Sequence, residues 1–71
     1  MYLTIYVENV QGQEALDLAN DIEGAMGIDV YGVYDIPPYN TEITIDGHSY
    51  RDGEDVEAML RAMGYKAVFD R

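Results

Sequence analysis

The sequence contains no cysteine and no tryptophan, and it has only four lysine and arginine residues. The absence of cysteine excludes disulfide bonds and zinc sites built on thiolates. No apolar run approaches the ~20 residues that a membrane-spanning helix requires. Residues 1–9 also lack the basic and apolar regions of a signal peptide. We therefore expect a cytoplasmic protein.

Residues that commonly perform catalysis or hold metal ions are also scarce. His48 is the single histidine and Ser49 the single serine, which argues against a Ser/His/Asp triad and against a zinc site of the usual kind. There is no glycine-rich phosphate loop, and residues 46–54 lack the ligand spacing of a calcium-binding loop. The acidic residues allow many carboxylate pairs, but none is marked as poised for acid–base chemistry. The sequence predicts a protein that is not an enzyme, with no cofactor and no metal site.

What the sequence does contain is enough apolar material for one small folded unit. The chain has 71 residues, and 48% of them are hydrophobic, which is too many for a disordered tail. A chain of this length forms one domain and buries a limited share of its surface. We expect a single acidic binding domain over residues 1–71.

Acidic residues dominate the charge of the chain. There are 14 of them against four bases, which gives a net charge of −10. Residues 1–50 hold nine acids and no base, whereas Arg51, Arg61, Lys66 and Arg71 share the remainder with five acids. A negative field of this kind repels nucleic acids and anionic membranes and attracts basic surfaces. The predicted partner is therefore basic, and neither nucleic acid nor a membrane is bound directly.

The first half of the chain reads as a strand, a helix and a second strand. In residues 1–8, Leu3, Ile5 and Val7 alternate with polar positions, which is the period of a half-buried strand. Apolar residues recur at helical spacing over residues 13–26, and Gly27 suits the left-handed residue that often ends a helix. The Val- and Tyr-rich residues 28–36 form the next strand, which ends at Pro37-Pro38.

The second half repeats this order with small differences. Residues 41–45 predict a third strand, followed by a hairpin turn at Asp46-Gly47 and a short extra strand over residues 48–51. Asp52 predicts the start of a helix that runs to about Met63, with Glu57 and Arg61 as an i,i+4 pair and Gly64 as its end. Residues 65–69 form the last strand.

This order predicts an α+β fold of the ferredoxin-like, split βαβ type (βαββαβ). Such a fold has a four-stranded antiparallel sheet with two helices on one face. A faint internal repeat agrees with it, because Ala25-Met26-Gly27 recurs as Ala62-Met63-Gly64 before a strand in each case. The run Leu60-Arg61-Ala62-Met63-Gly64-Tyr65-Lys66-Ala67 resembles the second helix-to-strand junction of heavy-metal-associated domains, which share this fold. Those domains bind metal through paired cysteines after the first strand, and residues 8–12 have none.

Two surface features are candidates for binding. Glu14, Asp17 and Asp21 lie at i, i+3 and i+7, a stripe on one side of the predicted helix that could reach the sheet edge near Asp29 or Asp35. If Leu3, Ile5 and Val7 face the helices, other side chains should form an aromatic patch on the open face of the sheet. We expect that patch to contain Tyr2, Tyr6, Tyr31 and Val33, joined by either Val68 or Phe69. Plainer interpretations are a solvated acidic face and cross-strand pairs that stabilise a small sheet.

The favoured hypothesis is a small acidic inhibitor whose carboxylates imitate DNA and which binds a basic, nucleic-acid-binding protein. In size and charge the chain resembles phage- and plasmid-borne inhibitors of CRISPR and restriction systems. Tyrosines would anchor the contact, since this residue type is common in interface hot spots. The expected contact residues are Glu14, Asp17, Asp21, Glu23, Asp29, Asp35, Tyr2, Tyr6 and Tyr31.

Two alternatives remain open. The first is a regulatory or assembly module that pairs through its sheet, as a homodimer or with a larger enzyme, with acidity serving only solubility. The second is adaptation to high salt, which also produces excess acid and few lysines; Lys66 is the single lysine. High-salt adaptation does not explain seven tyrosines in 71 residues.

Overall fold

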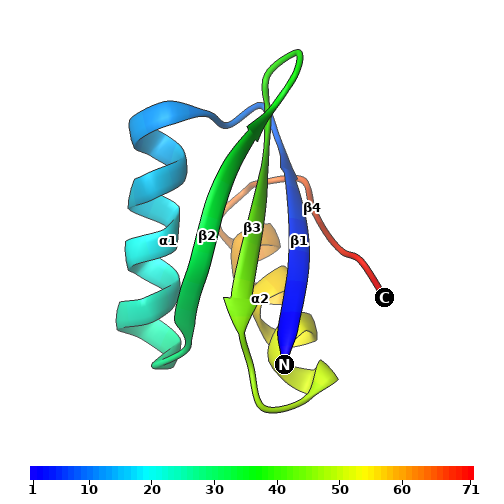
Figure 1. Ribbon diagram of the computed structural model, residues 1–71. Helices are drawn as coiled ribbons and strands as arrows, with labels where there is room; N and C mark the ends of the chain where they lie inside the picture. The colour runs from blue at the N-terminus through cyan, green and yellow to red at the C-terminus, as the bar shows by residue number, and fades with distance from the viewer.

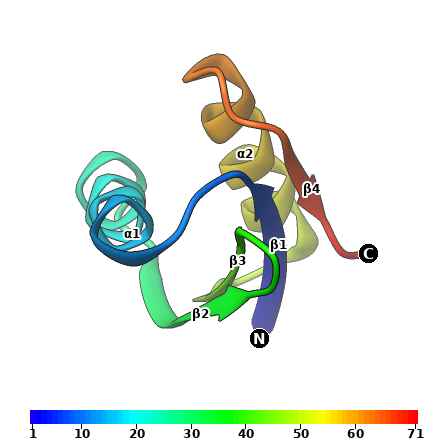
Figure 2. The same ribbon diagram turned by 90° about the horizontal axis from the view of Figure 1, so that it is seen from above.

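The computed structural model describes residues 1–71 as one four-stranded sheet with two helices packed on the same face (Figures 1 and 2). Neither helix is long and apolar enough to cross a membrane. The elements are β1 (Tyr2–Glu8), α1 (Gly12–Met26), β2 (Asp29–Ile36), β3 (Asn40–Asp46), α2 (Tyr50–Ala62) and β4 (Ala67–Phe69).

The strand order is β2-β3-β1-β4, and every neighbouring pair is antiparallel. Each helix therefore connects two parallel strands that have one antiparallel strand between them, which is the split βαβ arrangement. The predicted fold class is confirmed. The helix and strand boundaries differ from the predicted ones by one or two residues, except around residues 46–52.

Alternation along β1 determines which side of the sheet becomes the core. Leu3, Ile5 and Val7 are buried, and they lie opposite the buried residues Ile45, Ile43 and Thr41 of β3. One cluster of buried apolar residues joins this inner face to the helices. It consists of Leu3, Ile5, Val7, Val10, Ala15, Leu18, Ile22, Ile28, Ile43, Ile45, Val56, Leu60, Ala67 and Phe69. Burying each larger side chain of this kind contributes about 1.5–3 kcal/mol.

Glycines end both helices, as predicted. Gly27 adopts a left-handed conformation with φ 66°, and its N–H donates to the carbonyl of Glu23 at 3.0 Å. Gly64 has φ 97°, and the N–H groups of Gly64 and Tyr65 return to carbonyls of α2. Such paired bonds satisfy carbonyls that the end of a helix leaves free.

The predicted hairpin at Asp46-Gly47 and the extra strand over residues 48–51 are wrong. Gly47 N–H instead donates to the carbonyl of Met1 at 2.9 Å, so the chain start holds the segment that follows β3. The helix α2 begins at Tyr50, two residues before the predicted start at Asp52. The Asp52 carboxylate lies in the first turn and accepts the His48 N–H at 2.7 Å. A tertiary contact with the N-terminus thus replaces the local turn.

The predicted orientation of Val33 is also wrong. The register between β2 and β3 shifts between Val30 and Gly32, so Tyr31 is an extra residue in a β-bulge. Beyond the bulge Val33 lies opposite Ile43 and packs against the core, whereas Tyr34 lies opposite Glu42 on the open face. One inserted residue reverses the side that each later residue faces, because side chains in a strand alternate.

A contrast between two helix glycines tests this packing. A Cβ at Gly53 would lie 2.5 Å from the Phe69 ring, whereas a Cβ at Gly24 would meet nothing within 4 Å. Gly53→Ala should lower the free energy of unfolding by about 1–3 kcal/mol through overpacking. Gly24→Ala should raise it by about 0.4–1 kcal/mol, because alanine restricts the unfolded chain. Urea unfolding of both variants measures this; equal effects would contradict the packing of α2 on β4.

Candidate functional site

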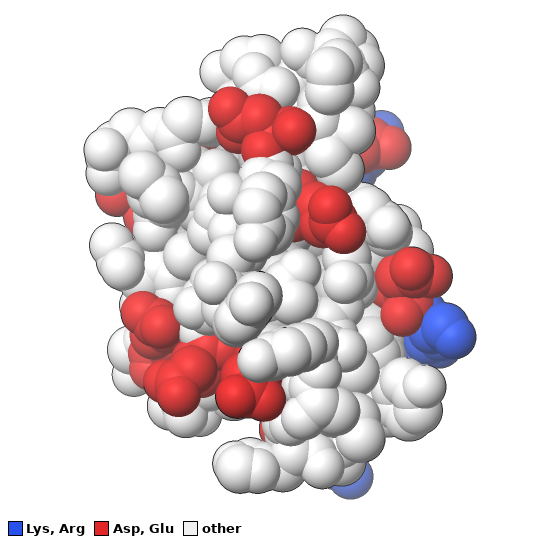
Figure 3. All heavy atoms as spheres, in the orientation of Figure 1, with Lys and Arg blue, Asp and Glu red and all other residues white.

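The open face of the sheet carries a patch of exposed tyrosines. The exposed fractions are 62% for Tyr2, 40% for Tyr6, 62% for Tyr31, 51% for Tyr34 and 52% for Val68. Figure 3 views this face and shows uncharged atoms over its middle, with acidic side chains around and between them. We call these five residues the tyrosine face. It contains the three tyrosines that the sequence predicted and Val68, one of the two residues expected from the last strand, and it adds Tyr34.

Contacts within the tyrosine face fix its side chains in pairs. The rings of Tyr2 and Tyr31 are 4.4 Å apart between centroids, with their planes tilted by 37°. The Tyr34 ring lies over Gly32, where any Cβ would come within 2.7 Å of it. Tyr6 lies beside Val68 of β4 and opposite Glu42 of β3. Aromatic contacts of this kind stabilise a small sheet.

Carboxylates lie among these tyrosines. Glu42 is the cross-strand neighbour of both Tyr6 and Tyr34, and Asp46 is the neighbour of Tyr2. The pKa of the Tyr6 hydroxyl is raised above its ordinary value, first by desolvation and then by the nearby carboxylates of Asp70 and Glu42. The hydroxyl therefore stays neutral at physiological pH and keeps its proton to donate. A basic side chain that approaches this face meets both aromatic rings and negative charge.

The acidic stripe of α1 lies elsewhere in the molecule. The Tyr65 hydroxyl, from the loop before β4, donates to the Glu14 carboxylate at 3.0 Å. This bond is the main reason that the pKa of Tyr65 is raised; desolvation and the charges of Glu14, Asp21 and Asp17 add to it. The stripe is thus on the side of α1 that faces the loop before β4, in the helix layer and away from the tyrosine face.

Three further acids of the predicted set flank β2. The Glu23 carboxylate accepts the Val30 N–H at 3.0 Å. The Asp35 carboxylate lies 3.5 Å from the Gly12 N–H at the start of α1. Asp29 lies opposite Asp46 at the other end of β2. The predicted contact residues therefore form three groups: tyrosines on the open face, a stripe on one side of α1, and acids along β2. The structure does not join the stripe to Asp29 or Asp35.

All four bases lie in α2, in β4 or next to them, and three of them contact backbone or carboxylate groups there. Arg61 does not pair with Glu57 as predicted; its Nε donates to the Ala67 carbonyl at 2.8 Å. Glu57 instead accepts the Phe69 N–H at 2.7 Å and pairs with Arg71 at 3.2 Å. Arg51 lies 4.0 Å from Asp55. The sequence could not show these contacts, because Arg61 and Glu57 reach a strand that only the fold brings to them.

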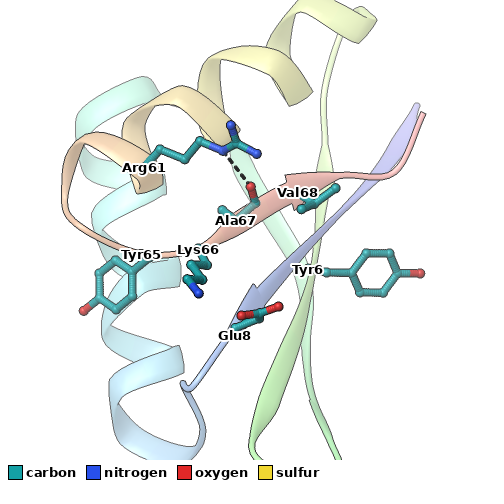
Figure 4. A pocket seen from close by; sticks show the side chains of 7 residues that line it. All are labelled: Tyr6, Glu8, Arg61, Tyr65, Lys66, Ala67 and Val68. Atoms are coloured by element: carbon teal, nitrogen blue, oxygen red, sulfur yellow. Dashed lines mark hydrogen bonds between the residues drawn. The ribbon is translucent and has the colours of Figure 1, made fainter.

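The largest hollow on the surface, of about 440 Å³, lies where β4 meets β1. Figure 4 shows that its side chains do not converge: Tyr6 and Tyr65 point in opposite directions, and Arg61 is turned to the Ala67 carbonyl. Glu8 and Lys66 are the other charged groups in its lining. The arrangement offers no acid–base pair or nucleophile held against a partner.

Comparisons with known proteins extend the description of the fold. Neither a protein-family model nor a curated protein matches the sequence. A solved structure, the prephenate dehydratase (PDT) from Staphylococcus aureus subsp. aureus Mu50, is similar with a TM-score of 0.68 and 16% sequence identity. The match covers 96% of this chain and 28% of that protein, so the chain spans little more than a quarter of its length. At this identity the likeness concerns the fold alone.

The contacts of Glu57 predict a pH-dependent contribution to stability. Its pKa is lowered, first by the Phe69 N–H and then by the hydrogen bond from Arg71, with desolvation opposing them. A lowered pKa stabilises the fold above the ordinary value of 4.5, and this contribution is lost as pH falls through the lower value. Glu57→Gln should therefore destabilise the protein at pH 7, and the difference from wild type should shrink below pH 4.5.

Urea unfolding between pH 3 and pH 7, taken as roughly the range over which carboxylates titrate, measures the effect. Glu54→Gln is the matched control, since that side chain is 56% exposed and meets Arg71 only at 3.6 Å. A difference for Glu57→Gln that stays constant with pH would contradict the role of its charge.

Proposed function

We propose that this protein is a non-enzymatic, cytoplasmic inhibitor that binds the basic surface of a nucleic-acid-binding protein in place of nucleic acid. The observation that carries the proposal is the tyrosine face, in which four exposed tyrosines lie among carboxylates and no lysine or arginine occurs in residues 1–50. Tyrosine and arginine are the residue types that most often dominate interface energetics. A tyrosine face with acidic neighbours suits arginines of a partner, which can pair with both.

The charge pattern supports a protein partner over nucleic acid. Aromatic side chains on the same face of this fold stack bases in RNA-recognition domains. That use requires phosphate neutralisation, which supplies most of the affinity for nucleic acids. A chain with a net charge of −10 repels phosphates instead, and it attracts the same basic surfaces that phosphates do. The proposed inhibitor therefore belongs with acidic DNA mimics of the anti-CRISPR or anti-restriction class.

The three groups of predicted contact residues take different parts in this proposal. The tyrosine face makes the close contact, together with Glu42 and Asp46. The stripe of Glu14, Asp17 and Asp21 lies in the helix layer and acts at longer range. Charges outside a close contact mainly change the rate of association, whereas buried contacts set the rate of dissociation.

The partner is identified by a pull-down from host lysate at low salt, with elution by duplex DNA or heparin. In binding kinetics with that partner, Tyr6→Ala should raise the dissociation rate at least about tenfold, as loss of an interface tyrosine does. Tyr39→Ala is the matched control, because Tyr39 is also exposed, at 53% against 40% for Tyr6, but lies in the turn between β2 and β3. Equal rates for the two variants would reject the tyrosine face as the contact.

Reversing charge on the stripe should act differently. Asp17→Lys with Asp21→Lys should slow association several-fold at low salt and leave the dissociation rate nearly unchanged. The difference from wild type should disappear as salt rises to about 0.5 M, where charges are screened beyond a few ångströms. An association rate that does not depend on salt in either protein would contradict the proposal that acidity guides binding.

A second candidate function is assembly through the sheet, as a homodimer or with a larger protein. The observation in its favour is the pair of Tyr2 and Tyr31, both 62% exposed on the same face as Val68. Association of this kind buries apolar surface, so it strengthens with salt where binding to a basic partner weakens. Sedimentation equilibrium of the chain alone at low and high salt separates the two functions.

A further inference from the structure

The two edges of the sheet, β4 and β2, differ in how far side chains cover their outward backbone groups. Side chains cover three of the four backbone groups that β4 directs outward: the Ala67 carbonyl, the Phe69 N–H and the Phe69 carbonyl; the fourth, the Ala67 N–H, has no side-chain acceptor. Arg61 occupies the first at 2.8 Å, Glu57 the second at 2.7 Å and Arg71 the third at 3.3 Å. Unpaired strand edges invite a further strand, and charged side chains that cover the backbone prevent this. Side chains therefore cover most of the β4 edge.

The hydrogen-bond pattern shows which groups the opposite edge directs outward. Glu8 N–H donates to the Lys66 carbonyl and Asp70 N–H to the Thr4 carbonyl, so even-numbered residues of β1 bond to β4. Successive residues of an antiparallel strand bond to opposite sides. Odd-numbered residues of β1 therefore bond to β3, where they lie opposite odd-numbered residues. The even-numbered residues of β3 are left to bond to β2. Beyond the bulge, Gly32 and Tyr34 then bond to β3.

Val33 and Asp35 therefore direct their N–H and carbonyl groups away from the sheet. No side chain of the protein covers them, although side chains do cover both ends of β2. Glu23 accepts the Val30 N–H at 3.0 Å, and the Gln11 amide donates to the Ile36 carbonyl at 3.4 Å. The open part of the β2 edge is thus a short segment, residues 31–35, between the covered Val30 N–H and Ile36, whose backbone groups the register directs to β3.

A groove runs along this open segment. It is lined by Gly12 and Leu16 of α1 and by Val33 and Asp35 of β2, with a volume of about 230 Å³. Leu16 is 50% exposed although it belongs to a helix with a well-buried face. Figure 2 shows α1 beyond the side of β2, so the helix would cover the inner face of one more strand. Leu16 and Val33 are placed to contact an apolar side chain of that strand.

The charge around the groove points to a basic occupant. Asp35 lies in the groove, Asp29 lies at the other end of β2, and neither α1 nor β2 contains a lysine or arginine. A second copy of this chain would bring the same acids against each other, and its net charge of −10 would add repulsion. A segment with lysine or arginine residues would neutralise them.

We propose that the open edge of β2 accepts an extended, basic segment of the partner protein as a fifth strand. The segment bonds to the backbone of Val33 and Asp35, inserts one apolar side chain between Leu16 and Val33, and places basic side chains near Asp29 and Asp35. Strand addition of this kind takes its affinity from main-chain hydrogen bonds and its specificity from alternate side chains. The inference rests on the proposed function only in that the partner is basic.

A peptide of defined backbone chemistry tests the inference without the native partner. The probe is Lys-Val-Lys-Ile-Lys-Val-Lys with blocked ends, and two further peptides carry N-methyl groups on alternate amides, one on the odd and one on the even positions. In an added strand only one set of amides faces β2. One N-methylated peptide should therefore lose at least about tenfold in affinity while the other retains it, with the charge the same in all three.

Amide hydrogen exchange and two variants provide independent readouts. The Val33 and Asp35 amides should exchange freely in the protein alone and become protected when the unmodified peptide binds. Val33→Pro removes one outward N–H, which a strand edge tolerates, and should abolish peptide binding. Val33→Thr retains the N–H and changes only the apolar contact of the side chain, so it should lose much less affinity than Val33→Pro. The backbone amide spectrum establishes whether Val33→Pro is folded; if it is not, the N-methylated peptides and the exchange data decide.

Three outcomes would overturn the inference. They are equal affinity of both N-methylated peptides, protection that appears on the tyrosine face and not at Val33 and Asp35, and concentration-dependent protection of these amides without peptide. The last result would assign the edge to a second copy. None of the three bears on the proposed function, which is tested by Tyr6→Ala with the native partner. If Tyr6→Ala did not change binding of the native partner, the proposed function would fail, but the result with the peptides would still stand.

Discussion

The position of β1 between β3 and β4 is the constraint on which the rest of the structure depends. Antiparallel neighbours on both sides determine that Leu3, Ile5 and Val7 face the helices, and they become buried. The same alternation directs Tyr2 and Tyr6 to the open face, where the proposed contact surface lies. Core and candidate site are thus two sides of one strand, because a one-residue shift would exchange them. The N-terminus reinforces the register, since the Met1 carbonyl accepts the Gly47 N–H.

The two edges of the sheet differ in charge, a difference that the net charge of −10 does not show. At the β4 edge, Arg61, Glu57 and Arg71 occupy three of the outward backbone groups, and Glu57 pairs with Arg71. The β2 edge has acids and no base, and its middle is uncovered. This charge would attract the proposed basic partner toward the β2 side, which the tyrosine face adjoins through Tyr31 and Tyr34. In the proposed complex, the acidic charge and the exposed aromatic rings would then meet the partner on the same side of the molecule.

Most of the fold could be predicted from the sequence because the local signals agree with the tertiary arrangement. Alternation in residues 3–7, helical spacing in residues 15–26 and the glycines after both helices each indicate the element that forms. The errors occur where a distant contact overrides a local signal. Asp46-Gly47 has the composition of a hairpin turn, but the chain start takes its N–H. The local signal of the bulge is Gly32, a glycine inside the strand, and the bulge reversed the predicted side of Val33.

The sequence by itself determined the fold class, the excess of acids in the first 50 residues and three tyrosines of the open face, because period and composition are local properties of the chain. Only the tertiary structure decided how these features combine. It separated the acidic stripe of α1 from the tyrosine face, because helix and open face lie on opposite sides of the sheet. It covered most of the β4 edge and left the middle of the β2 edge uncovered, because the side chains that reach β4 come from α2 and the C-terminus. Such contacts depend on strand order, which brings together residues that are far apart in the chain.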